Sequence, residues 1–219
     1  MTAGAGGAAD GGASGAPGEA LPPPRCTHLL YLHGFRSSPQ SAKARAVAAW
    51  VAAHRPDAAW HCPQLPPSPA EAMRGVLDHV SGWPRESMAV IGSSLGGFYA
   101  TFVAERIAPG CRAALLNPAV HPARDLSKYI GELTAWHGDD RFFFREEFID
   151  ELRALECADL TRPERYLAVV AKGDEVLDWR EMAARYAGCQ IRLLEGGDHA
   201  LSDFAEAHLP EVVRFLGLA

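Results

Sequence analysis

The sequence lacks an excess of positive charge and any long apolar run. Its 219 residues contain 21 Lys and Arg against 27 Asp and Glu, which gives a formal net charge of −6, and no basic run occurs. Because nucleic acids and anionic membrane surfaces attract concentrated positive charge, we expect neither as a partner. No segment approaches the roughly 20 apolar residues that a membrane-spanning helix needs. With 48% hydrophobic residues, the chain can instead bury the core of a soluble protein.

Cysteine is also scarce. Five cysteines are scattered along the chain without a C-x-x-C spacing, namely Cys26, Cys62, Cys111, Cys157 and Cys189. Their odd number and wide spacing indicate neither a disulfide framework nor a zinc site. Reduced thiols in the cytoplasm are the simplest interpretation. We therefore expect a cytoplasmic protein, and the sequence indicates neither a metal nor a cofactor.

Residues 1–24 lack what a signal peptide needs. No Lys or Arg precedes Arg25, and the segment is mainly Gly and Ala without a long apolar core. A signal peptide has both a basic start and an apolar core, so none is indicated. A segment of this composition buries too little apolar surface to fold. We predict a disordered tail over residues 1–24 and one folded domain over residues 25–219.

The folded part alternates apolar, strand-like runs with helical patterns. Six candidate strands lie near residues 28–32, 58–62, 87–92, 111–116, 166–171 and 189–194. Alternation of this kind produces a mainly parallel sheet covered by helices on both faces. The expected fold class is therefore α/β, with three α/β/α layers and about six strands.

Several helix starts carry capping signals. We predict a helix that begins at Ser38-Pro39 and reaches about His54. Ser68 precedes a proline and stands three residues before a glutamate, a pattern typical of an N-cap. Asp178 is also followed three residues later by a glutamate, so we expect it to cap another helix.

An apolar run followed by G-x-S-x-G and a helix-like segment carries the strongest functional signal. This order is typical of a nucleophile elbow, in which a sharp strand-to-helix turn exposes a serine above the sheet. The turn requires small residues two before and two after the serine. Gly92 and Gly96 occupy these positions around Ser94, whereas Ser93 would have bulky neighbours. The alternative is a glycine-rich turn that binds a phosphate or nothing.

Two polar groups follow later strand ends. Asp174 follows the strand near 166–171 and its glycine turn, and His199 follows the last strand. Carboxyl ends of parallel strands meet at one sheet edge, where ligands bind. There Ser94 would attack a carbonyl carbon, His199 would transfer its proton, and Asp174 would orient the imidazole. The competing acids are Glu175, Asp178, and Asp139 and Asp140, before which we predict no strand. The competing bases are His208 and the upstream histidines.

The loop after the first strand supplies a fourth signal. Acyl transfer needs N–H donors that face the developing oxyanion. One donor is expected from Leu95, which follows the serine, and the other from Phe35 in the His33-Gly34 loop. The alternative is an ordinary strand-ending turn, with the Phe35 side chain serving only for packing.

Taken together, these motifs resemble the α/β-hydrolase superfamily, and more closely the small YqiA-like bacterial esterases. The matching stretches lie between about Cys26 and the C-terminus, at residues 30–39 (LYLHGFRSSP), 91–99 (IGSSLGGFY), 116–119 (LNPA), 173–176 (GDEV) and 197–199 (GDH). The resemblance implies a strand order 2-1-3-4-5-6, esterase activity on short acyl esters through an acyl-enzyme, and Ser94, Asp174 and His199 as a triad. We also assign His33, Gly34 and Asn117 to the substrate pocket.

A long segment interrupts the alternation after the fourth strand. About fifty residues separate it from the next strand, more than one crossover helix requires. We interpret residues 121–160 as a small cap over the acyl site. We expect its aromatic residues Phe142, Phe143, Phe144 and Phe148 to line the substrate pocket. The alternative is that these aromatics only pack the segment onto the core.

Three functions remain open from the sequence. The first is a serine carboxylic-ester hydrolase with a small-molecule acyl ester as its partner. The second is a thioesterase, acyltransferase or carbon–carbon hydrolase with the same triad. The third is a non-catalytic binding module of the hydrolase fold, which would normally lack a triad member. The sequence does not determine the oligomeric state.

Overall fold

The computed structural model describes residues 1–2, 25–107, 110–134 and 141–219, so the predicted tail lies almost wholly outside the described residues. Within these ranges, the main sheet has six strands, all paired in parallel, in the order β2-β1-β3-β4-β7-β8. The strands are β1 (His28–Leu32), β2 (Ala59–His61), β3 (Met88–Ser93), β4 (Arg112–Leu116), β7 (Tyr166–Ala171) and β8 (Gln190–Leu194). The predicted sheet and its strand order are confirmed.

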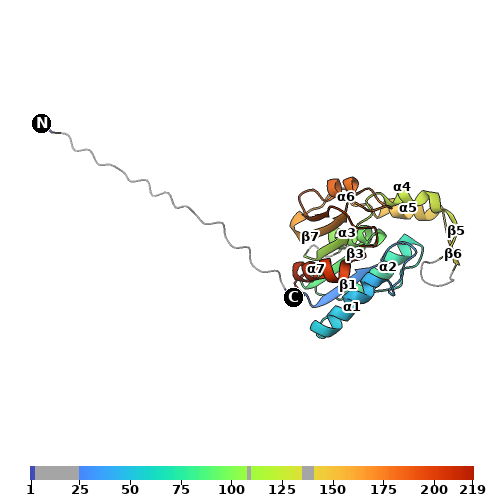
Figure 1. The fold of residues 1–219 in the computed structure, drawn as a ribbon, viewed down its shortest axis with the longest axis horizontal. Helices are drawn as coiled ribbons and strands as arrows, with labels where there is room; N and C mark the ends of the chain where they lie inside the picture. The colour runs from blue at the N-terminus through green and yellow to red at the C-terminus, as the bar shows by residue number, and fades with distance from the viewer. Residues whose placement is uncertain (3–24, 108–109, 135–140) are drawn as a thin grey trace.

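Helices cover both faces of this sheet, which makes three layers (Figure 1). The helices are α1 (Ala42–His54), α2 (Pro69–Val80), α3 (Leu95–Arg106), α4 (Pro122–Leu126), α5 (Glu147–Ala154), α6 (Trp179–Arg185) and α7 (Leu209–Phe215). Side chains of one strand alternate between the two faces. Leu30 and Val90 therefore pack with α2, α3, α5 and α6, while Leu29 and Ile91 pack with α1 and α7.

Two of the predicted helix caps are present. Ser68 Oγ accepts a hydrogen bond from the Glu71 amide at 3.2 Å at the start of α2, and Asp178 Oδ1 accepts one from the Arg180 amide at 2.9 Å at the start of α6. The predicted start at Ser38-Pro39 is wrong. Ser38 Oγ accepts from the Gln40 amide at 3.1 Å within a separate turn, and α1 begins only at Ala42.

The segment between β4 and β7 contains more strand than the sequence indicated. It comprises α4, the short 3₁₀ helix η1 (Ser127–Tyr129), an antiparallel hairpin of β5 (Gly131–Thr134) and β6 (Arg141–Phe144), and α5. The hairpin projects from one end of the molecule beside α4 and α5 (Figure 1). Strands of four residues are too short to show a reliable alternation, which explains why the hairpin was missed.

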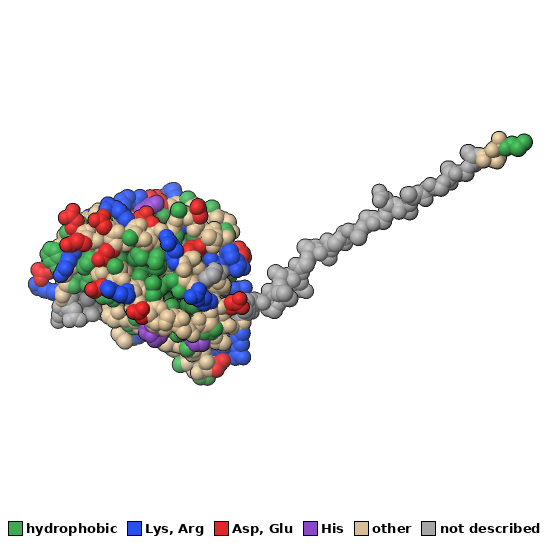
Figure 2. Space-filling model, turned by 180° about the vertical axis from the view of Figure 1, so that it is seen from behind, with side chains coloured by type: hydrophobic (Ala, Val, Ile, Leu, Met, Phe, Trp, Pro, Cys, Tyr) green, Lys and Arg blue, Asp and Glu red, His purple; other side chains and the backbone are tan. Residues whose placement is uncertain are grey.

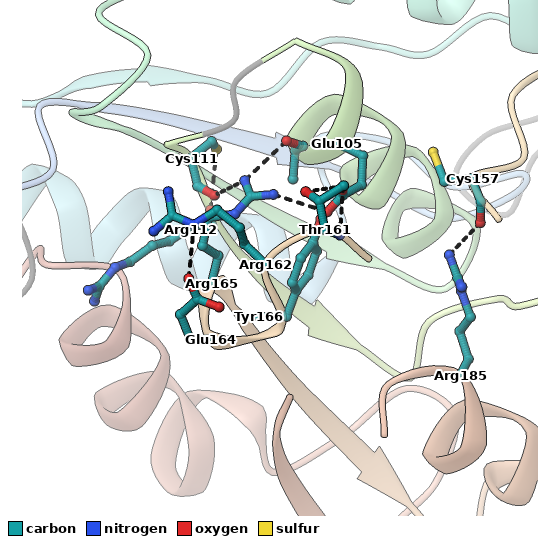
Figure 3. A network of polar contacts seen from close by, with 11 residues as sticks. Glu105, Cys111, Arg112, Cys157, Thr161, Arg162, Glu164, Arg165, Tyr166 and Arg185 are labelled. Carbon is teal, nitrogen blue, oxygen red and sulfur yellow. Dashed lines mark hydrogen bonds and ion pairs between the residues drawn. The ribbon is translucent and has the colours of Figure 1, made fainter. Parts of the chain in front are cut away.

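A buried ion pair joins α3 to the short 3₁₀ helix η2 (Pro163–Arg165), which directly precedes β7 (Figure 3). The Arg165 guanidinium lies 3.0 Å from Glu105 Oε1, and the two side chains are only 3% and 5% exposed. Arg165 also donates to the carbonyls of Ala104 and Cys111, and Glu105 accepts from Thr161 and from the Tyr166 hydroxyl. These contacts satisfy charges that would otherwise be costly to bury.

The surface mixes charges of both signs. On the face drawn in Figure 2, hydrophobic side chains form a central group with Lys, Arg, Asp and Glu side chains around it. In the part of the chain that the structure describes, no helix has both the length and the apolar character to cross a lipid bilayer.

Candidate active site

Ser94 lies on a sharp turn between β3 and α3. Its φ of +55° and ψ of −122° are a backbone conformation that costs energy for a residue with a side chain. A Cβ at Gly92 would lie 2.2 Å from the Gly96 carbonyl oxygen, and a Cβ at Gly96 would lie 1.9 Å from the Leu32 carbonyl oxygen. Both positions therefore exclude side chains, for the reason that the sequence pattern indicated.

Neighbouring backbone holds this strained turn in place. The Ser94 amide donates to the Leu116 carbonyl at 3.0 Å, and the Ser94 carbonyl accepts from the amides of Gly97 at 2.8 Å and Ala119 at 3.0 Å. Such contacts compensate a local strain that an isolated turn would release.

The side chains of Ser94, His199 and Asp174 form one chain of hydrogen bonds. His199 Nε2 lies 3.0 Å from Ser94 Oγ, and His199 Nδ1 lies 2.8 Å from Asp174 Oδ2. Because an ionised carboxylate only accepts, Nδ1 carries the proton of a neutral imidazole, and Nε2 is free to accept from the serine hydroxyl.

The Asp174 carboxylate is completely buried, with 0% side-chain exposure. Its other oxygen, Oδ1, accepts hydrogen bonds from the amides of Val176 and Leu177, each at 2.8 Å. A buried carboxylate needs such partners, and here they also fix its orientation toward His199.

The competing acids and base lie elsewhere or act differently. Glu175 Oε2 accepts from the His199 amide at 3.0 Å and so holds the histidine's backbone rather than its ring. Asp178 caps α6. His208 is buried in the π-helical turn η3 (Phe204–His208), 3.4 Å from Asp203.

Asp139 and Asp140 lie outside the described residues. The prediction that no strand precedes these two aspartates is wrong, because β5 ends at Thr134, only a few residues earlier.

Asn117, assigned to the substrate pocket, is a positioning residue instead. It is fully buried, and its side-chain amide donates to the carbonyls of Asp198 at 3.0 Å and His199 at 3.2 Å. Its Oδ1 accepts from the Ala171 amide at 2.8 Å. The side chain therefore ties the loop that carries His199 to the end of β7, and it leaves no polar group for a substrate.

We expect Asn117→Ala to lower both stability and activity. Three hydrogen bonds are lost, and the buried Ala171 amide loses its acceptor, at a cost of about 1–3 kcal/mol. A displaced His199 should reduce the rate of any reaction that these hydrogen-bonded side chains catalyse by up to about 100-fold. Thermal melting and kcat/KM measure the two effects. Gln190→Ala, which removes an exposed amide at the start of β8, should change neither; equal effects from both variants would contradict this role.

A cavity of about 470 Å³, here called the Ser94 cavity, opens above the hydrogen-bonded side chains. Ser94, Leu95, Phe35 and His199 line it, together with residues of α4, η1 and the loop after β7. Among the described residues, neither the Phe35 amide nor the Leu95 amide donates a hydrogen bond. Leu95 begins α3, where amides have no acceptor within the helix.

Lys43 of α1 is a lining residue of the Ser94 cavity that sequence reasoning missed. Its ammonium donates to the Ala200 carbonyl, beside His199. Burial lowers the pKa of Lys43 to about 8, although the negative charges of Asp198 and Asp174 oppose the shift. No sequence motif marks this lysine, because only the packing of α1 against the last loop brings it to the site.

Three of the four aromatic residues predicted for the pocket do not line the Ser94 cavity or the space beside it. Phe143 is 58% exposed on the outer side of the hairpin, whereas Phe144 and Phe148 are buried in the core. Strand alternation explains this, because Phe143 must point away from its two neighbours. Of the four, Phe142 alone lines the cavity next to the Ser94 cavity.

The segment 121–160 nevertheless contributes to the Ser94 cavity through other residues. Pro122, Asp125 and Leu126 of α4 and Lys128 and Tyr129 of η1 line it. The wall of the cavity on this side is therefore mixed in polarity rather than aromatic.

His33 and Gly34 line the cavity next to the Ser94 cavity and not the Ser94 cavity itself. His33 Nε2 accepts from the Leu65 amide at 3.1 Å, which leaves the proton on Nδ1, 3.0 Å from the Gly34 carbonyl oxygen. A Cβ at Gly34 would lie 3.2 Å from the Ser94 Cβ, so the loop passes closely beside the serine. Through its contact with Leu65, His33 thus links the β1–α1 loop to the β2–α2 loop.

The residues described in the structure include no cluster of three or more His, Cys, Asp or Glu that could hold a metal ion. All five cysteines are unpaired.

Comparison with known proteins places the chain in a family and a fold. Residues 28–217 match the uncharacterised protein family UPF0227. The chain is similar to Est1E from Butyrivibrio proteoclasticus, with a TM-score of 0.64, 19% identity, and coverage of 88% of this chain and 87% of that one. It is also similar to the esterase domain of a Rhodothermus marinus protein (TM-score 0.60, 21% identity, 89% and 88% covered). An esterase from Pyrococcus furiosus is similar as well (TM-score 0.58, 14% identity, 88% and 82% covered). The chain therefore belongs to the uncharacterised protein family UPF0227, and its fold is that of the α/β hydrolases.

Proposed function

We propose that this protein is a serine carboxylic-ester hydrolase that acts on small acyl esters through an acyl-enzyme. The observation that carries the proposal is the continuous chain of contacts from Ser94 through His199 to the buried Asp174. The names of the similar structures, which include esterases, agree with it. The five unpaired cysteines also support a reducing compartment, the cytoplasm, as its location.

In the acylation step, Ser94 Oγ attacks the ester carbonyl carbon while His199 Nε2 removes the hydroxyl proton. The imidazolium that forms is stabilised by Asp174, which accepts from Nδ1 at 2.8 Å. His199 then gives its proton to the departing alkoxide, and the acyl group stays on Ser94. Water attacks the acyl-enzyme with His199 again as the base. His199 then returns the proton to Ser94 Oγ as the acyl bond breaks, and the carboxylic acid product leaves.

The negative charge on the carbonyl oxygen needs donors during both steps. The amides of Phe35 and Leu95 fit this role, because both residues line the Ser94 cavity and neither amide is engaged elsewhere among the described residues. Preorganised donors of this kind stabilise the oxyanion more strongly than water does. Gly34 lets the Phe35 backbone approach the serine closely.

Hydrolysis of p-nitrophenyl acetate and butyrate tests the proposal, with acyl-CoA thioesters assayed in parallel. Turnover of the oxygen esters, with stoichiometric labelling by a fluorophosphonate, is the expected result. Preference for the thioesters would support the alternative thioesterase. No turnover of either class, and no labelling, would show a non-catalytic protein of the same fold.

Asp174→Asn should lower kcat by about 10⁴-fold. An amide in place of the carboxylate favours the wrong imidazole tautomer and no longer stabilises the imidazolium. Asp178→Asn, four residues away, should leave kcat unchanged and cost at most about 1 kcal/mol of stability through a weakened cap. Steady-state kinetics and thermal melting separate the two, and equal activity losses would leave Asp174 without its assigned role.

A further inference from the structure

A second cavity lies beside the Ser94 cavity. It has a volume of about 300 Å³ and is lined by the β1–α1 loop, the β2–α2 loop, α3 and the hairpin, so we call it the β2–α2 cavity. Its apolar lining includes Leu65, Pro66, Pro67, Tyr99 and Phe142. The volume is at the lower end of what small-ligand pockets provide. Nothing in the proposed chemistry has used this space so far.

The Phe35 side chain separates the two cavities. Its ring lies 5.7 Å from the ring of Tyr129, which lines the Ser94 cavity, and 6.2 Å from that of Phe142, which lines the β2–α2 cavity. Phe35 and Leu95 line both spaces. The two amides proposed to bind the oxyanion therefore belong to the residues that form the dividing wall.

The position of His199 decides which part of an ester occupies which cavity. His199 must give a proton to the departing alkoxide, so the alcohol has to lie next to its imidazole. His199 lines the Ser94 cavity and does not line the β2–α2 cavity. With the carbonyl oxygen at the Phe35 and Leu95 amides, the acyl chain can then pass beside Gly34 into the β2–α2 cavity.

The two linings differ in charge, although apolar surface makes up a similar share of both. The Ser94 cavity is lined by the charged residues Arg36, Lys43, Asp125, Lys128 and Glu175. In the β2–α2 cavity, whose uncharged polar lining residues are His33, Ser37, Ser38 and Gln64, Arg36 is the only charged residue among those described, and its Nε donates to the Thr134 carbonyl at 2.6 Å. A polar alcohol can therefore find charged partners in the Ser94 cavity, whereas an acyl chain needs none and fits the β2–α2 cavity.

We propose that the β2–α2 cavity is the acyl-chain subsite and that the Ser94 cavity holds the alcohol. The preferred substrates are then esters of an apolar acyl chain with a polar alcohol. This assignment rests on the proposed esterase function and adds the orientation of the substrate. Leu65, Pro66 and Pro67 of the β2–α2 loop, together with Phe142, would then contact the acyl chain.

Two substitutions, each of which narrows one of the two cavities, test the proposed orientation of the substrate. Both variants are assayed with two series of esters. Leu65→Trp narrows the β2–α2 cavity, and Val176→Trp narrows the Ser94 cavity from a side chain that is 56% exposed. One series is p-nitrophenyl esters from acetate to octanoate, and the other is acetates of alcohols of increasing length. Pro66→Trp, at an exposed position of the same loop, replaces Leu65→Trp if the latter fails to fold by circular dichroism.

Leu65→Trp should lower the octanoate-to-acetate ratio of kcat/KM by roughly tenfold or more and leave the ratios in the alcohol series unchanged. Val176→Trp should change the ratios in the alcohol series and leave the octanoate-to-acetate ratio unchanged. Phe143→Ala, which removes an exposed ring that lines neither cavity, should alter neither series. If Leu65→Trp and Pro66→Trp changed only the alcohol series, or neither series, the assignment would be overturned. Wild-type turnover of p-nitrophenyl acetate separates that outcome from failure of the esterase proposal.

Discussion

Ser94→Ala should lower ester turnover by roughly 10⁴-fold or more while leaving the fold intact. The substitution removes the only atom of this residue that can attack the carbonyl, and the remaining amides and cavity retain a small part of the rate enhancement. The backbone contacts that hold the turn, from the Ser94 amide and carbonyl, do not involve the side chain. Steady-state kinetics with p-nitrophenyl acetate measure the rate, and circular dichroism confirms the fold.

Ser93→Ala is the matched control, because Ser93 also lines the Ser94 cavity but ends β3. It should retain most of the activity. Mass spectrometry after fluorophosphonate treatment should find the label on Ser94 alone. Labelling of Ser93, or full activity in Ser94→Ala, would show that the nucleophile is another residue.

Arg165→Met should lower the free energy of unfolding by about 3–5 kcal/mol, because it leaves the Glu105 carboxylate buried without its opposite charge. That is a large part of the stability of a typical domain. Arg165 directly precedes β7, whereas Asp174 follows the end of this strand. Urea denaturation measures the loss, and kcat of the folded fraction should remain close to that of the wild type.

The loss of stability caused by Arg165→Met should also depend on pH. Burial by itself raises the pKa of Glu105, but hydrogen bonds from Tyr166 and Thr161 and the charge of Arg165 outweigh it and lower the pKa. A carboxyl group with a lowered pKa in the folded state contributes stability above its ordinary pKa, and this contribution disappears as the pH falls. The difference between wild type and Arg165→Met should therefore be largest near neutral pH and shrink in acid.

An exposed ion pair provides the comparison for this prediction. On α5, Arg153 Nη1 lies 2.6 Å from Asp150 Oδ1, and the two side chains are 62% and 79% exposed. Arg153→Met should cost at most about 1 kcal/mol, because water and salt screen such a pair. If Arg165→Met cost no more than Arg153→Met, or lost as much stability in acid as at neutral pH, the buried pair would not stabilise the fold as argued.

Much of the fold could be predicted because the relevant patterns are local. Each buried strand of a parallel sheet is a short apolar run, and the helices between them start at recognisable caps such as Ser68. The hairpin of β5 and β6 escaped prediction because four-residue strands carry too little pattern. The start of α1 was misplaced because a serine before a proline can also form an isolated turn, as Ser38 does.

The residues of the candidate site also divide into those that local pattern could predict and those that it could not. Ser94, Asp174 and His199 could be selected because each follows a strand end, and parallel strand ends share one edge of the sheet. Lys43, Glu175 and Asn117 could not be assigned their contacts from the sequence. Each of the three contacts the His199–Ala200 loop from a distant part of the chain, and no spacing rule connects them.

By itself, the sequence determined the six strands of the main sheet and the turn at Ser94. Both follow from local pattern: each strand is a short apolar run, and Gly92 and Gly96 are needed because neighbouring backbone leaves no room for a Cβ. Only the tertiary structure decided what surrounds the serine. Phe143 points to solvent and Tyr129 toward the Ser94 cavity because of how the hairpin and η1 pack on the domain. The walls of a cavity come from segments that meet only after folding, so their identity depends on packing rather than on local pattern.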